Sequence, residues 1–265
     1  MEYAAHCRSK FSRISVTVAV CLIAGTLAGC ASKSKLTTGS VASFNKPLAQ
    51  MNATELNNAA RTAGAKYKSN PKSGPIAMQY ASVLLMTGSN EQALAVMQQA
   101  AIHNPEDRTV LAAYGKAQAG AGNLDQALQT IRRAQTPDQP NWKLLSAEGA
   151  ILDQLGQSVQ ARYKYREALD IVPDEPSVLS NLGMSYVLEG DLRTAETYMR
   201  NASKQPAADS RVRQNLALIV GLQGRFDEAE KIARGELSGN QAEANVRYLR
   251  EMLAQSNSWK KLADS

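Results

Sequence analysis

The stretch PSVLSNLGMSYVLEGDLRTAETYMRNASKQP, residues 176–206, contains the pattern that decides the fold. Gly190 stands near its centre, Gly183 lies seven positions earlier, and alanines follow five and twelve positions later. Glycine readily adopts the left-handed backbone conformation that ends a helix. Small residues let two helices approach closely, where a larger side chain would clash. The stretch therefore predicts two antiparallel helices joined by a tight turn.

The same pattern recurs every 34 residues. The helix-ending glycines are Gly88, Gly122, Gly156, Gly190 and Gly224, and the small residues before them are Ala81, Gly115, Gly149, Gly183 and Ala217. The alanines that follow are Ala93, Ala127, Ala161, Ala195 and Ala229, then Ala100, Ala134, Ala168 and Ala202. Prolines close the units at Pro71, Pro105 and Pro173, with Pro140 and Pro206 displaced by one position. Such a period indicates an array of repeated helix pairs.

This combination of small residues, glycine and closing proline resembles the tetratricopeptide repeat family over about residues 53–255. The resemblance implies an all-α fold, a right-handed superhelical solenoid of antiparallel helix pairs. We expect a half-repeat helix at residues 54–69, five full repeats and a capping helix, followed by a C-terminal tail at residues 256–265. The apolar stripe of the capping helix is predicted to be Ala242, Val246, Leu249 and Leu253.

The first thirty residues have the features of a processing signal. Three basic residues precede an uncharged, mostly apolar run at residues 14–26, and Leu27, Ala28 and Gly29 lead directly to Cys30. This ending resembles the lipobox of bacterial lipoproteins, which implies cleavage after residue 29 and lipidation of Cys30. The alternative is an uncleaved membrane anchor, for which the apolar run is short. Residues 30–52, rich in Ser, Thr and Lys, are predicted to form a lipidated flexible tether.

Lipoproteins of this kind carry three acyl chains, and an Asp just after the cysteine often retains them in the inner membrane. Ala31 occupies that position here, so the resemblance implies the periplasmic face of the outer membrane. Loss of residues 1–29 removes three cations and one acid, which lowers the net charge from +6 to +4. The remaining Lys and Arg residues are interleaved with acids, a pattern that does not indicate a nucleic-acid partner.

Residues that could carry chemistry are scarce. All three cysteines lie within the first thirty residues, and the histidines are His6 and His103, the latter at a predicted helix end. The acidic pairs Asp174–Glu175 and Asp227–Glu228 fall at turns or helix starts, where carboxylates favour capping. Phosphate-binding, nucleophile-elbow and zinc-protease motifs are not found. We therefore expect no catalytic residue, metal or cofactor.

The first helix of each pair is predicted to line a groove that binds a protein partner. Its lining would be small, apolar and lightly charged, which suits an extended or helical apolar segment. The alternative is that several of these side chains only contact the neighbouring repeat. The predicted groove residues are Met78, Ser82, Leu85, Lys116, Lys143, Asp153, Ser180, Met184, Val187, Gln214 and Leu218.

The chain as a whole is similar to the TadD-like lipoproteins of tight-adherence (Flp) pilus assembly. The resemblance lies in the lipobox, the tether with its LTTGS stretch, the half-repeat and five repeats, and in stretches such as NPEDRTVLAAYGKAQAGAG and EPSVLSNLGMSYVLEGDLRTAE. It implies a pilotin-like scaffold that assists assembly of the pilus secretion apparatus, in particular its outer-membrane secretin. The alternatives are a scaffold for outer-membrane barrel assembly or cell-wall synthesis, and an enzyme or enzyme activator.

Overall fold

The computed structural model describes residues 46–48 and 51–263, with side chains described up to residue 255. The predicted signal, the lipobox residues Leu27 to Cys30 and most of the predicted tether lie outside these residues.

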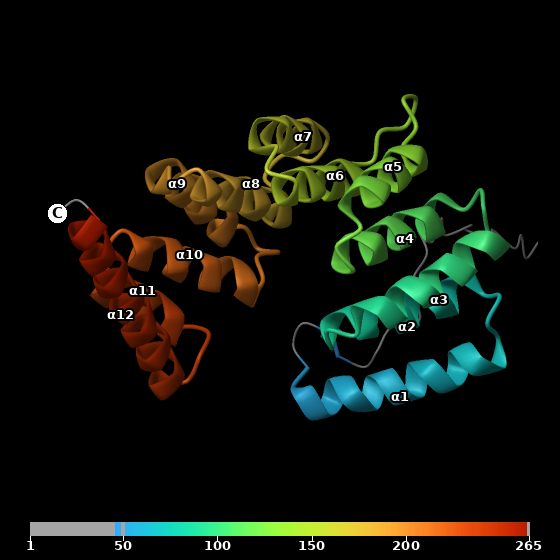
Figure 1. Ribbon diagram of the computed structural model, residues 1–265, viewed down its shortest axis with the longest axis horizontal. Coiled ribbons are helices and arrows are strands. Elements are labelled where there is room, and N and C mark those ends of the chain that lie inside the picture. The colour runs from blue at the N-terminus through green and yellow to red at the C-terminus, as the bar shows by residue number, and fades with distance from the viewer. Residues whose placement is uncertain (1–45, 49–50, 264–265) are drawn as a thin grey trace, which may run out of the picture. The chain divides into compact units, whose positions relative to one another are not determined.

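Helices make up the described part of the chain, which contains no β-strand. Figure 1 shows them following one another as antiparallel neighbours in chain order. A first helix, α1, precedes five helix pairs, and α12 follows them, which confirms the predicted all-α repeat fold. The bounds are α1 Ala53–Ser69, α2 Gly74–Met86, α3 Asn90–His103, α4 Arg108–Gly120, α5 Leu124–Ala134, α6 Trp142–Gln154, α7 Ser158–Ile171, α8 Pro176–Leu188, α9 Leu192–Lys204, α10 Ser210–Leu222, α11 Phe226–Arg234 and α12 Gly239–Ala263.

The periodic glycines end the first helix of each pair, as predicted. All five have φ between 73° and 82°, in the left-handed region. At Gly190 the turn is closed by the Asp191 N–H, which donates to the Tyr186 carbonyl at 3.0 Å. A Cβ added to Gly190 would meet no heavy atom within 4 Å. The requirement for glycine here is therefore conformational and not steric.

The small residues inside the first helices serve the other purpose, close approach of the two helices in a pair. A Cβ added to Gly149 on α6 would lie 2.6 Å from the Tyr165 ring on α7, and one on Gly115 would lie 2.8 Å from Ile131. Ala161, on the facing side of α7, is fully buried. These contacts confirm the helix-pair register that the sequence predicts.

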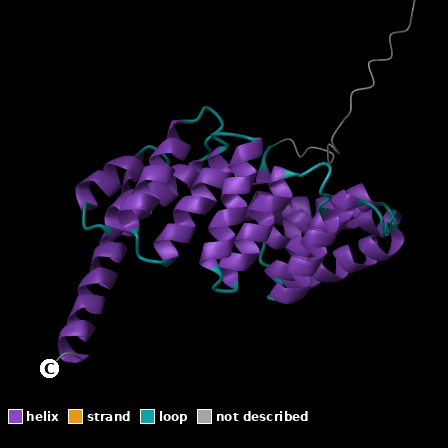
Figure 2. Ribbon diagram, turned by 90° about the horizontal axis from the view of Figure 1, so that it is seen from above, coloured by secondary structure: helices purple, strands orange, loops and turns teal. Residues whose placement is uncertain are grey.

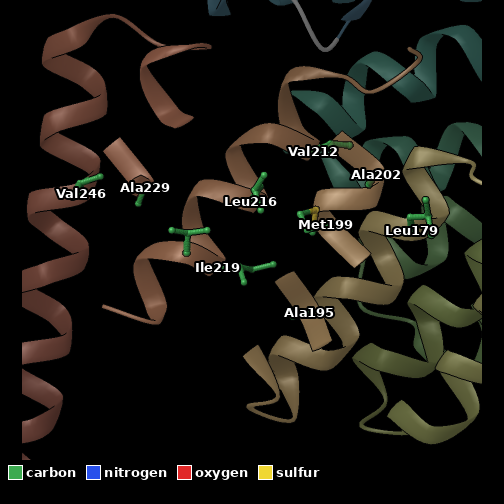
Figure 3. Packing of buried hydrophobic residues seen from close by; sticks show 10 residues of the cluster. Leu179, Ala195, Met199, Ala202, Val212, Leu216, Ile219, Ala229 and Val246 are labelled. Atoms are coloured by element: carbon green, nitrogen blue, oxygen red, sulfur yellow. The ribbon is translucent and has the colours of Figure 1, made fainter. Parts of the chain in front are cut away.

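The core continues from one pair into the next. One buried cluster draws Leu179 from α8, Met199 from α9, Leu216 and Ile219 from α10, and Val246 from α12 (Figure 3). Similar clusters join α2 to α4 and α6 to α8. Each pair is thus stabilised chiefly by the pairs on either side of it, as in other solenoids.

Contacts between pairs also define an inner and an outer side of the array. The first helices contact one another, α2 with α4, α4 with α6, α6 with α8, and α8 with α10, and α10 contacts α12. The second helices α3, α5, α7, α9 and α11 make no comparable contacts among themselves. Since the first helices approach each other more closely, they form the inner side. We call α2, α4, α6, α8 and α10 the inner helices.

The two ends of the array differ from the middle. At the start, Asn52 caps α1 in a capping box with Glu55, and the Lys46 ammonium pairs with the same carboxylate at 2.9 Å. The last residues of the predicted tether therefore lie against α1. At the other end, α11 has nine residues, fewer than any other second helix. Helix α12 continues through the predicted tail to Ala263.

Candidate binding surface

The inner helices carry few charges, and their acids are all engaged within the fold. Helices α2 and α8 have no charged residue, and α4 and α10 have no acid. The two acids of the inner helices are Glu148 and Asp153, both on α6. The buried Glu148 accepts from Arg132 Nε at 2.8 Å. The surface of the inner helices therefore offers no acid free to repel an anionic partner.

Asp153 joins three helices. Its Oδ2 accepts from the Tyr165 hydroxyl on α7 at 3.0 Å, and its Oδ1 accepts from the fully buried Ser185 hydroxyl on α8 at 2.8 Å. Burial, with the adjacent negative charge, raises the pKa of the Tyr165 phenol well above its ordinary value, so this group stays a hydrogen-bond donor. The sequence predicts Asp153 as a groove residue. In the structure its carboxylate links α6 to α7 and α8 through these two hydrogen bonds.

Two lysines of the inner helices, Lys116 on α4 and Lys143 on α6, form no ion pair with the described residues. The helices around Lys116 displace part of the hydration of its ammonium, and the charge of Lys143 acts in the same direction, so the pKa of Lys116 is lowered. The sequence suggests two isolated lysines, whereas this interaction indicates that Lys116 and Lys143 lie within electrostatic range of each other on the inner side.

Serines and asparagines link successive inner helices at a spacing of 35 residues. Asn181 Nδ2 donates to Ser146 Oγ at 3.1 Å, and Asn215 Nδ2 donates to Ser180 Oγ at 3.3 Å. Ser180, a predicted groove residue, is 5 % exposed and engaged in this second contact. A polar cavity of about 300 Å³ lies beside it, between the starts of α8 and α10.

The C-terminal end of the inner side is apolar. Leu218 on α10 is 37 % exposed, and Tyr248 and Met252 on α12 are 64 % and 44 % exposed. With Val246 and Leu249 they line a groove of about 330 Å³ between α10 and α12. The sequence pattern predicts Leu218 as a groove residue but not Tyr248 or Met252, because a capping role accounts only for the buried stripe of α12. Their spacing of four residues beside the buried stripe was the available signal.

The remaining predicted groove residues divide by burial. Met78, Leu85, Met184 and Val187 are half-buried and pack against the core clusters. A Cβ added to Gly120 would lie 2.8 Å from Leu85, so Leu85 contacts the next repeat, as the alternative interpretation expects. Gln214 is exposed and Ser82 is half-buried.

Other chemistry has little support in the residues that the structure describes. Among them, no group of three or more His, Cys, Asp or Glu side chains is placed to hold a metal ion. Glu175 caps α8, and Asp227 and Glu228 lie in the first turn of α11, the positions that the sequence predicts for these acids. No helix in the described residues has the length and apolar character needed to cross a membrane.

The fold and the inner surface define a helical repeat array, and part of this array matches the model of a known family. A family model of the tetratricopeptide repeat matches residues 84–148. A solved tetratricopeptide-repeat protein of Thermus thermophilus superposes with a TM-score of 0.55 at 21 % identity, covering 63 % of this chain and 91 % of that one. The Cut9–Hcn1 hetero-tetramer of APC/C gives a TM-score of 0.59 at 17 % identity, covering 78 % of this chain and 40 % of that chain.

A curated relative, BBSome complex member BBS4 of Bos taurus, is 23 % identical over 137 residues, 52 % of this chain. The match spans 26 % of that protein. The family model thus identifies tetratricopeptide repeats over residues 84–148, and the solved structures show the same fold over more of the array. Such folds are typically scaffolds that bind protein partners and not enzymes.

Proposed function

We propose that this chain is a lipid-anchored envelope scaffold whose inner surface binds a segment of a partner protein during assembly of a tight-adherence pilus secretion apparatus. The observation that carries the binding role is the character of the inner surface. It combines exposed apolar side chains towards α12 with two lysines, on α4 and α6, that form no ion pair with the described residues. The two acids of the inner helices are hydrogen-bonded within the fold.

The chemistry of this surface restricts the ligand. Apolar side chains would pack against Met184, Leu218 and the groove between α10 and α12. An acidic side chain in the same segment would lie near Lys116 and Lys143, which form no ion pair with an acid of the described residues. Adjacent inner helices are about 8–10 Å apart, so an extended segment would cover the distance from α6 to α10 with roughly six residues at about 3.3 Å each.

The pilus role rests on the sequence resemblance to TadD-like lipoproteins, and the same resemblance supports the secretin as partner and the outer membrane as location. Cys30 would hold the scaffold at the periplasmic face, beside the secretin. Two or more acyl chains give stable anchoring where one gives only marginal binding, so a triacylated Cys30 would suffice.

The test is capture of the pilus secretin by inner-surface variants of the full chain. Leu218→Glu and Met184→Glu place a carboxylate on the apolar part of the inner surface, and we expect each to reduce secretin capture by about tenfold or more, which corresponds to roughly 1.4 kcal/mol. Val159→Glu is the matched control, because Val159 lies on the outer helix α7 and is 73 % exposed.

Capture that equals the parent's in both inner-surface variants would place the binding site elsewhere on the array. Failure of the parent chain itself to capture the secretin would instead reject the pilus assignment while leaving the repeat scaffold intact. Thermal melts of each variant separate a loss of binding from a loss of folding.

A further inference from the structure

Helix α12 has two apolar stripes, and only one of them is used within the chain. Ala242, Val246 and Leu249 are buried against α10 and α11. Tyr248 and Met252 lie on another side of the helix and are exposed. Figure 2 shows the C-terminal half of α12 projecting beyond the other helices. The second stripe therefore has no partner within the described residues.

The two charged residues beside this stripe have opposite signs, so they could pair with the same two residues of a second copy. At 100° per residue, Arg247 and Glu251 fall on the same flank of the stripe, four residues apart. Arg247 has only a long contact of 3.7 Å with Glu243, and both of these side chains are largely exposed. Glu251 forms no ion pair with the described residues.

We propose that a second copy of this chain packs on α12, with the two α12 helices antiparallel about a two-fold axis near residue 250. A two-fold axis brings each residue on one flank opposite the same flank of the partner, with the chain direction reversed. Tyr248 of each copy then lies against Met252 of the other, and Arg247 lies against Glu251. Both contacts occur twice, and the two helix dipoles run in opposite directions.

A single antiparallel pair explains both observations, the exposed stripe and the arrangement of its flanking charges. In a parallel pair the two copies of this flank would lie on opposite sides of the interface, so Arg247 and Glu251 of different copies could not pair. Two helices make a small interface of the kind found in weak associations, so we expect a dissociation constant on the order of 10 µM. Anchoring on a membrane would raise the effective concentration of the two copies. The dimer would cover Tyr248 and Met252, so a second copy and the partner segment would exclude each other from the groove between α10 and α12.

Orientation is tested by cysteine crosslinking of the full chain in cells. Residues 31–265 contain no cysteine, so introduced thiols give unambiguous products. Two differently tagged copies carry Tyr248→Cys and Met252→Cys, and disulfides form only when the Cα atoms are about 4.4–6.8 Å apart. We expect the mixed 248–252 crosslink to exceed either self-crosslink at least fivefold. Dominant 248–248 and 252–252 products, or no disulfide in any pair, would overturn the antiparallel dimer.

Energetics are tested by sedimentation of the mature lipoprotein in density-matched detergent, without any partner protein. Tyr248→Glu should weaken dimerisation at least tenfold, whereas Tyr163→Glu, at a similarly exposed tyrosine on the outer helix α7, should not. Arg247→Glu should weaken the dimer, and adding Glu251→Arg should restore it. A monomer at 100 µM, about ten times the expected dissociation constant, or a double variant no better than Arg247→Glu, would refute the proposal. Because no secretin is present, this outcome is independent of the proposed pilus role, although the lipid anchor of the sample belongs to the proposed function.

Discussion

Gly149→Ala tests whether close approach of α6 and α7 holds the third repeat together. The new Cβ would lie 2.6, 2.9 and 2.9 Å from three Tyr165 ring atoms, about 1 Å inside the normal carbon–carbon contact of about 3.5–4.0 Å. Tyr165 is 2 % exposed and its hydroxyl is tied to Asp153, so the ring has little freedom to move. Overpacking of this kind costs about 1–3 kcal/mol.

Helix propensity acts in the opposite direction, since alanine is favoured over glycine in a helix by about 1 kcal/mol. The overlap involves three ring atoms, which places its cost in the upper part of the range. We therefore expect a net loss of about 1–2 kcal/mol, which for an array of this size corresponds to a melting temperature about 2–8 °C lower. Urea unfolding followed by circular dichroism, together with a thermal melt, measures both quantities.

A double-mutant cycle separates the steric clash from other causes. In a Tyr165→Leu background the ring is gone, and Gly149→Ala should become neutral or stabilising. Gly122→Ala is the control, because its Cβ would meet nothing within 4 Å and its cost arises from φ of 82°. That cost, about 1 kcal/mol, should be equal in both backgrounds. An equal effect of Gly149→Ala with and without Tyr165 would refute the packing argument.

Three further perturbations follow from the described contacts and from the proposed lipobox. Asp153→Ala should lower the free energy of unfolding by about 1–3 kcal/mol in urea, because the buried Ser185 hydroxyl loses its acceptor. Adding Ser185→Ala should recover part of the loss. An unchanged unfolding midpoint in Asp153→Ala would contradict the role of Asp153 in joining the helices. Arg225 lowers the pKa of Glu196 to about 2, so the ionised carboxylate stabilises the fold above the unfolded pKa near 4.5 and this contribution is lost as the pH falls through about 2. The stability advantage of the parent over Glu196→Gln should therefore shrink between about pH 5 and pH 2, whereas a constant difference would reject the assignment. Cys30→Ser should release the protein from the outer-membrane fraction, and unchanged fractionation would reject the lipobox.

The fold was predictable because its determinants are properties of single residues at a fixed period. A helix end that needs positive φ selects glycine, and a close contact between helices selects Gly or Ala, so both appear in the sequence itself. Gly190 is needed for its positive φ, and Gly183 is needed for the close approach of α8 and α9. A position that needs positive φ but holds a residue other than glycine cannot be recognised from the sequence. Asp174, which has φ of 62° before α8, is such a position.

The binding surface was less predictable because it depends on pairs of residues from different helices. The proximity of Lys116 and Lys143 arises from the stacking of α4 on α6, and a scan along one helix cannot reveal it. The engagement of Asp153 by Tyr165 and Ser185 likewise depends on side-chain directions on three helices. In the same way, the exposure of Tyr248 depends on how α12 is rotated against α10.

Packing between neighbouring pairs gives the array mechanical properties that a single compact core lacks. Because each pair packs mainly on its neighbours, a small rotation at each interface between pairs would add to the next and change the length of the array. A pulling force between the proposed lipid anchor and a bound partner would pass through each interface between pairs in turn. The pair with the least packing would separate first. The last pair is the candidate, because its second helix, α11, has only nine residues.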